Sequence, residues 1–302
     1  MRNRIKIAQN GPTFSRLVFG TMKWGVWGWK LRTRAIIQLI EESIEAGVTT
    51  FDHADIYGDY TTESDFGKAL KVRPDLRKKL EIVTKCGINL ITPNRTQHRI
   101  KSYSTDKNHI IKSTENSLTT LGVNHIDLLL IHRPSPLMHP DEMAEAFTQL
   151  RAQGKVRHFG VSNFTVSQFE MLQSRFSLVT NQVEASILHL PPFLDGTFDQ
   201  CLKKRISPMA WSPLGGGNLF TEQGEVRIQR IQKVANELCD KYDATPDQIY
   251  LAWLLKHPSK ILPVLGTARI DRVRAAVDAL RIDMTDEEWF MLWSASTGKE
   301  VP

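Results

Sequence analysis

Short apolar runs rich in β-branched residues recur along the whole chain. Eight of them occupy residues 17–19, 49–51, 81–84, 126–131, 156–161, 178–183, 207–211 and 261–265. Most of these runs are continuous rather than alternating, as expected for strands that are covered on both faces. The pattern therefore predicts eight buried strands, spread from one end of the chain to the other.

Helical patterns fill the intervals between these runs. An amphipathic stretch over residues 33–46 begins at Thr33 and stops before Gly47, a residue type that commonly follows a helix end. Similar stretches cover residues 105–122, 140–154, 167–174 and 271–280. Alternating strands and helices predict βαβ units and a parallel sheet. Eight units in 302 residues predict an α/β fold closed as a (β/α)8 TIM barrel.

The chain shows no low-complexity linker or shift in composition, so residues 1–302 are predicted to form a single domain. Residues 87–104 and about 213–225 are too long for plain strand-to-helix loops, and long structured loops on a barrel usually shape a site. Before the first strand, Asn10-Gly11 is a strong signal for a two-residue hairpin turn. We therefore predict an N-terminal β-hairpin that caps the bottom of the barrel.

Composition narrows the class of protein further. The net charge of +6 is small and the basic residues are scattered, with the densest runs at 77–79 and 203–205 beside predicted helix ends. Such runs complement the helix dipole, so we expect no nucleic-acid partner. Apolar runs never approach 18 residues, and the three cysteines lie far apart without a CxxC pair. We expect a cytoplasmic protein with no membrane partner and no metal. The oligomeric state stays open.

Polar residues stand where the predicted strands end. Asp52 and Lys85 close the second and third runs, His132 follows the fourth, and Tyr57 lies in the loop after Asp52. Each residue alone is more often structural than catalytic. In a parallel barrel, however, the carboxyl ends of all strands meet at one mouth, where charged groups need partners. Packing alone does not account for their joint presence at this mouth, which indicates a functional site.

These residue types support a specific chemistry. The hydroxyl of a tyrosine has a pKa of about 10, and a neighbouring cation favours its ionised form. Lys85 can supply that cation, and Asp52 can keep Lys85 protonated and oriented. His132 can donate a hydrogen bond to a carbonyl oxygen that gains negative charge. Side chains cannot supply a hydride, so the chemistry requires a cofactor.

Seven segments resemble the aldo-keto reductase superfamily, in family order and over nearly the whole chain: FDHADIYG, VTKCG, DLLLIHRP, GVSNF, NQVE, MAWSPLGGG and PVLGTARIDRVRAAV. Their arrangement is similar to a bacterial branch of oxidoreductases. The resemblance implies that Asp52, Tyr57, Lys85 and His132 form the catalytic tetrad. It implies reduction of aldehyde or ketone carbonyls by direct hydride transfer, with Tyr57 as the general acid.

The resemblance also implies a cofactor path. It assigns the nicotinamide carboxamide to Ser162, Asn163 and Gln182, and stacking under the ring to Trp211, where the family usually has tyrosine. Ser212, Leu214 and Gly215 match contacts to the pyrophosphate.

The adenosine end departs from the family pattern. Members that prefer NADPH often carry Lys-Ser where this chain has Gly266 and Thr267, and an Asn where it has Ala276. Arg272 matches the family arginine, and Arg269 is an additional cation. Two arginines at a helix N-terminus suit a 2′-phosphate. NADPH is therefore the expected cofactor, with NADH as the second possibility.

The substrate and two alternative functions remain open at this point. Among Trp24, Trp27 and Trp29 after the first strand, Trp24 is the best candidate to line an apolar substrate pocket. A different use of the same barrel would make Lys85 a Schiff-base lysine in a lyase. A third reading is a nucleotide-sensing regulatory module with little turnover. The residues specify neither the physiological carbonyl compound nor the direction of the reaction.

Overall fold

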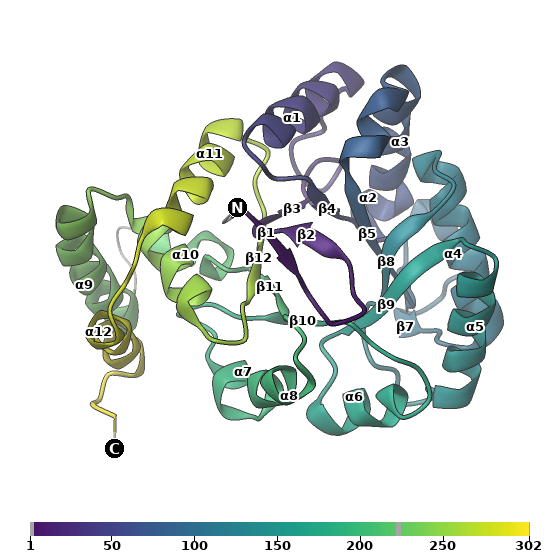
Figure 1. The fold of residues 1–302 in the computed structure, drawn as a ribbon. Coiled ribbons are helices and arrows are strands. Elements are labelled where there is room, and N and C mark those ends of the chain that lie inside the picture. The colour runs from purple at the N-terminus through teal and green to yellow at the C-terminus, as the bar shows by residue number, and fades with distance from the viewer. Residues whose placement is uncertain (1–2, 222–224, 302) are drawn as a thin grey trace.

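The computed structural model describes residues 3–221 and 225–301. Eight parallel strands close into a barrel in the order β10-β11-β12-β3-β4-β5-β8-β9, surrounded by helices (Figure 1). The predicted barrel is thus confirmed, and each of the eight predicted runs overlaps a barrel strand. The strands are β3 (Val18–Gly20), β4 (Thr50–Asp52), β5 (Glu81–Cys86), β8 (Ile126–Ile131), β9 (Val156–Ser162), β10 (Asn181–Glu184), β11 (Met209–Trp211) and β12 (Leu262–Leu265).

Helices follow every barrel strand. Those after the first four strands are α1 (Thr33–Glu45), α2 (Tyr57–Tyr60) with α3 (Thr62–Val72), α4 (Lys107–Leu121) and α5 (Pro140–Ala152). Those after the last four are α6 (Val166–Gln173), α7 (Pro191–Leu194) with α8 (Thr197–Lys204), α9 (Val226–Tyr242) with α10 (Pro246–Lys256), and α11 (Ile270–Asp278) with α12 (Asp286–Thr297). Helix α12 lies beside α9 at the edge of the molecule (Figure 1). In the described residues, the helices are too short or too polar to cross a lipid bilayer.

A hairpin of β1 (Arg4–Lys6) and β2 (Thr13–Ser15) lies across one end of the barrel, as predicted (Figure 1). The two-residue turn at Asn10-Gly11 was wrong, because strand pairing stops at Lys6 and Thr13 and six residues connect the strands. Ile7 still bonds across the hairpin, since its amide donates to the Pro12 carbonyl at 3.1 Å, while its side chain is 1% exposed and its carbonyl accepts a hydrogen bond from the Ser207 amide at 2.7 Å. The Gly11 amide donates to the Ala8 carbonyl at 3.0 Å, so the turn is centred on Gln9-Asn10, one residue before the predicted pair.

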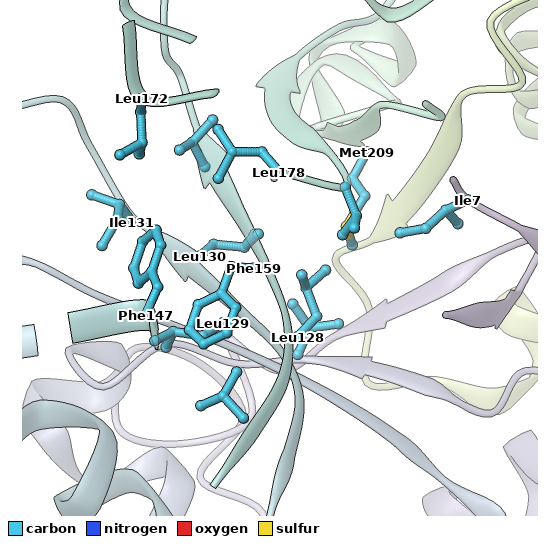
Figure 2. Packing of buried hydrophobic residues seen from close by; sticks show 14 of the residues in the cluster. Ile7, Leu128, Leu129, Leu130, Ile131, Phe147, Phe159, Leu172, Leu178 and Met209 are labelled. Atoms are coloured by element: carbon cyan, nitrogen blue, oxygen red, sulfur yellow. The ribbon is translucent and has the colours of Figure 1, made fainter. Parts of the chain in front are cut away.

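Strand β8 is buried along its whole length, since all six of its residues are buried. Phe147 of α5 stacks on Phe159 of β9 with ring centroids 4.5 Å apart, and both lie beside Leu129 (Figure 2). Such an aromatic pair adds about 0.5–1.5 kcal/mol beyond the area it buries. Because β8 is covered on both faces, its sequence is apolar without alternation. This packing fixes the wall from which His132 emerges.

The two long stretches predicted to be loops carry short elements. Within residues 87–104, β6 (Ile88–Asn89) pairs antiparallel with β7 (Ser102–Tyr103), and a 3-10 turn spans Pro93–Arg95. The second stretch holds a 3-10 turn over Gly215–Phe220, whereas its residues 222–224 lie outside the described residues. Further 3-10 turns span Pro74–Lys79 and Ala279–Arg281.

Candidate active site

The four predicted catalytic residues meet at the carboxyl ends of three adjacent strands. Asp52 ends β4, Lys85 lies in β5, His132 follows β8, and Tyr57 begins α2. Strand β5 pairs with β4 on one side and with β8 on the other, in parallel, so that residues far apart in sequence reach one edge. The barrel register therefore assembles the predicted tetrad.

Lys85 lies at the centre of this group. Its ammonium nitrogen donates to Asp52 Oδ2 at 2.6 Å, to the His53 carbonyl at 2.8 Å and to the Tyr57 hydroxyl at 3.1 Å. The side chains of Lys85 and Asp52 are only 1% and 3% exposed. All three ammonium hydrogens are thereby used, as a buried cation requires.

Gln182 completes the group from β10. Its amide nitrogen donates to Asp52 Oδ1 at 2.9 Å, while Lys85 occupies the other carboxylate oxygen. From the sequence, Gln182 was predicted only to bind the cofactor, and this contact with Asp52 was missed. No local signal could have revealed it, because the two residues are 130 positions apart.

Burial dominates the protonation of the site. It raises the pKa of Tyr57, and this effect outweighs the opposing influence of Lys85. Lys85 favours the ionised form, as expected, but it does not offset burial, so the phenol keeps its proton at neutral pH. Burial lowers the pKa of Lys85, but Asp52 and Tyr57 raise it above its usual value. For His132, burial acts together with Lys85 and Arg133 to hold the pKa well below its usual range, so the imidazole is neutral.

The residues assigned to the nicotinamide lie next to this group. Asn163 donates to Ser162 Oγ at 2.7 Å and accepts from the Trp211 indole at 2.9 Å. Asn163 has a positive φ of 60°, and Ser212, after β11, has one of 50°. Non-glycine residues seldom adopt this conformation, and it is often associated with functional sites. These strained positions hold an amide, a hydroxyl and an aromatic face together at the mouth.

The residues assigned to the pyrophosphate follow β11. The Gly215 amide donates to the Ser212 carbonyl at 2.9 Å, and Leu214 is partly buried against the core. Gly215 has a φ of +59°, and a Cβ there would lie 2.7 Å from Leu188. The positive φ favours glycine at this position, and a larger residue would also have to displace the Leu188 side chain.

The residues assigned to the adenosine surround the start of α11. Gly266 is exposed, and the carbonyl of Thr267 accepts from the Trp24 indole at 3.1 Å. Arg269 pairs with Asp271 through both of its carboxylate oxygens. Arg272 forms no ion pair with any residue in the described part of the chain. Of the two predicted arginines, one is therefore already paired.

Trp24 lies in the core, and its assignment to a substrate pocket was wrong. It is 1% exposed and packs against Phe19, Phe51 and Phe66. Trp27 instead reaches the mouth, because its ring lies 6.3 Å from that of Tyr57 and it is 38% exposed. The alternation of side chains in this loop could not be read from its sequence.

A cavity of about 750 Å3 opens beside the group, at the carboxyl ends of β9, β10 and β11. Asn163 and Trp211 contribute to its wall, together with Arg133. The Arg133 guanidinium lies 5.6 Å from the centroid of the Trp211 ring. Arg133 belongs to the motif DLLLIHRP, and no role was predicted for it from the sequence.

The chain belongs to the aldo/keto reductase family, whose family model matches residues 16–296. Members of this family are oxidoreductases that generally use NAD(P)H and act on small-molecule carbonyl substrates. The barrel and the order of the motifs agree with this membership.

Relatives match over almost their full length. The chain is 50% identical to "Oxidoreductase YdhF" of Escherichia coli K12, covering 100% of both chains. It is 46% identical to "6-dehydroglucose reductase" of Agrobacterium fabrum, covering 95% of this chain and 96% of the relative. Among solved structures, the thermostable aldo-keto reductase Tm1743 superposes with a TM-score of 0.79 at 30% identity, over 97% of this chain and 99% of that one.

Proposed function

We propose that the protein is an NADPH-dependent oxidoreductase that reduces aldehyde or ketone carbonyls to alcohols, with Tyr57 as the general acid. The observation that carries this proposal is the contact of the Tyr57 hydroxyl with the Lys85 ammonium at 3.1 Å. Asp52 and the His53 carbonyl hold that ammonium in place. A phenol beside a fixed, buried cation can release its proton when a reaction demands it.

The side chains divide the proton chemistry among them. Tyr57, protonated at neutral pH because burial raises its pKa, gives its proton to the carbonyl oxygen. Lys85 stabilises the phenolate that forms, and Asp52 keeps Lys85 oriented. Neutral His132 donates a hydrogen bond to the same oxygen as negative charge develops. Bound NADPH supplies the hydride that the carbonyl carbon accepts, so that the products are an alcohol and NADP+.

The residues at the mouth suit such a cofactor. Ser162 and Asn163 provide the hydroxyl and amide that a carboxamide can bind, and Trp211 provides an aromatic face. At the start of α11, Arg272 has no carboxylate partner among the described residues, and backbone N–H groups of the first turn favour an anion. This donor set favours NADPH over NADH, with Arg272 contributing more than the paired Arg269.

The alternative functions have less support. A Schiff-base lysine must be unprotonated to attack a carbonyl, but Lys85 is held as an ammonium by three contacts and a raised pKa. A nucleotide-sensing module would bind NADPH without turnover, and the experiment below distinguishes it from an enzyme.

The test is the variant Tyr57→Phe, assayed for consumption of NADPH and NADH with a panel of aldehydes, ketones and quinones. We expect a loss of turnover of about 10²–10⁴-fold, with the Kd for NADPH within about twofold of wild type, because the change removes only the acid. Tyr103→Phe, at an exposed tyrosine in β7, is the matched control and should keep full activity. Near-normal turnover in Tyr57→Phe would overturn the mechanism, and NADPH binding by the wild type without any turnover would favour the regulatory module.

A further inference from the structure

The turn that follows Tyr57 has an unusual backbone. Gly58, Asp59 and Tyr60 have φ values of 58°, 56° and 68°, so three consecutive residues lie in the left-handed region. Such residues normally occur singly, and a bulky residue such as Tyr60 seldom adopts this conformation. Strain of this kind persists where surrounding contacts impose it, and it is concentrated at functional sites. The contacts of this turn therefore indicate what the strain maintains.

The side chain of Tyr60 binds the long loop over residues 87–104. Its hydroxyl donates to the Ile88 carbonyl at 3.2 Å and accepts from the Leu90 amide at 3.1 Å. The guanidinium of Arg95 lies over its ring, 4.4 Å from the centroid. One hydroxyl thus acts as both donor and acceptor, and it joins the strained turn to β6.

The two segments that Tyr60 joins also carry the two central groups of the proposed proton chemistry. Tyr60 ends α2, which begins at Tyr57, and Ile88 begins β6, which follows β5 with Lys85. The Tyr57 hydroxyl contacts the Lys85 ammonium at 3.1 Å. Ile88 and Tyr57 also belong to one buried apolar cluster. The segments are therefore connected twice, once through the predicted catalytic pair and once through Tyr60.

We propose that Tyr60 is a positioning residue, which keeps the Tyr57 hydroxyl within reach of the Lys85 ammonium by fixing the turn after Tyr57 to β6. The inference rests on the proposed function, in which Tyr57 gives a proton and Lys85 stabilises the phenolate. Without the Tyr60 contact, the strained turn would relax and Tyr57 would move with it. A displacement of about 1 Å in a reacting group can cost about 10²-fold in rate.

The first experiment compares Tyr60→Phe with the wild type in the reduction of benzaldehyde, or of the best substrate in the panel above, by NADPH. The change removes the hydroxyl and keeps the ring. We expect kcat to fall about 10- to 100-fold. The KM for the aldehyde and the Kd for NADPH should stay within about twofold, because the geometry of the chemical step is lost rather than binding. A kcat within about twofold of wild type would overturn the inference and leave the proposed function intact.

Tyr242→Phe is the matched control for a loss of stability alone. The Tyr242 hydroxyl donates to the Asp283 carbonyl at 3.1 Å and to Glu288 Oε2 at 2.6 Å, where α9 lies beside α12 at the edge of the molecule (Figure 1). Both variants should lower the midpoint of urea unfolding, but Tyr242→Phe should keep its kcat within about twofold of wild type. Equal losses of kcat in the two variants would overturn the inference.

A double variant tests whether Tyr60 acts through Tyr57. In the Tyr57→Phe background, Tyr60→Phe should change the residual turnover by less than about twofold, because the acid that Tyr60 positions is already absent. A residue that only stabilises the fold would lower turnover equally in both backgrounds, and that result would overturn the inference. Failure of the wild type to reduce any carbonyl compound, or full activity in Tyr57→Phe, would overturn the proposed function and the inference with it.

Asn94→Ala provides a second variant if Tyr60→Phe does not fold. The Asn94 side-chain amide donates to the Asp59 carbonyl at 2.8 Å, so it joins the same loop to the same turn. Because this hydrogen bond is exposed, its loss should lower kcat less, by about two- to fivefold, again without a change in the Kd for NADPH. An unchanged kcat would then overturn the inference.

Discussion

The two ends of the proposed cofactor path are built in opposite ways. At one end, Lys85 and Asp52 are 1% and 3% exposed and are held by several hydrogen bonds. At the other, the side chains of Arg269 and Asp271 are 52% and 60% exposed and pair on the surface. A buried charge left without its partner costs several kcal/mol, whereas an exposed ion pair contributes about 0–1 kcal/mol. The fold therefore fixes the geometry around Lys85 and leaves the exposed end of the proposed cofactor path adjustable.

The largest effect is expected at the buried end. Lys85→Met should lower the free energy of unfolding by about 3–5 kcal/mol, because it leaves the Asp52 carboxylate unpaired in the barrel. Turnover should fall by about 10²–10⁴-fold, since the phenolate of Tyr57 loses its stabilising cation. Urea unfolding and steady-state kinetics measure the two effects separately.

A double variant separates stability from catalysis at the same site. Lys85→Met combined with Asp52→Asn should recover most of the lost stability, because no unpaired charge is left behind, but it should not recover turnover. A double variant as unstable as the single one, or one that regains activity, would contradict the picture of a buried pair with a catalytic role.

A smaller effect concerns His53, also at the buried end. Burial and then Lys85 lower its pKa to about 3, and its Nε2 has no hydrogen-bond partner among the described residues. Below its unfolded pKa of about 6.5, the unfolded chain takes up a proton that the folded chain refuses until about pH 3. The free energy of unfolding should therefore fall as pH falls through this window, by up to about 1.4 kcal/mol per pH unit from His53.

The variant His53→Asn tests this titration. The free energy of unfolding of this variant, measured in urea between about pH 7 and pH 5, should change less steeply with pH than that of the wild type. The difference in slope should correspond to about one bound proton. His139→Asn, at a histidine whose side chain is 62% exposed, should keep the wild-type slope. An unchanged slope in His53→Asn would show that the buried imidazole does not resist protonation.

The smallest effect is expected at the exposed end. Asp271→Asn should release Arg269 from its partner and lower the Kd for NADPH by about two- to fivefold, with little change for NADH, because only NADPH carries the extra phosphate. Added salt should reduce the difference. Asp278→Asn, at another exposed ion pair of the same helix, is the control. Equal changes for both nucleotides would place the 2′-phosphate elsewhere.

The architecture could be predicted well from the sequence, because strands that are buried on both faces appear as continuous apolar runs. The run over residues 126–131 coincides with β8, whereas the run over 178–183 begins three residues before β10. Hydrogen bonds to β9 continue at two of these three residues: the Val179 amide donates to the Phe159 carbonyl, and the Val161 amide donates to the Thr180 carbonyl. The difference therefore concerns where the strand is counted to begin, and not how the chain is paired.

By itself, the sequence determined the barrel, the family and the residue types at each strand end, because periodicity and motifs depend on chain neighbours. Only the tertiary structure decided that Trp24 is core and Trp27 reaches the mouth. It also decided that burial outweighs Lys85 in setting the pKa of Tyr57, and that Gln182 binds Asp52 across 130 residues. These outcomes depend on register, burial and distance in space, which neighbouring positions in the chain do not encode.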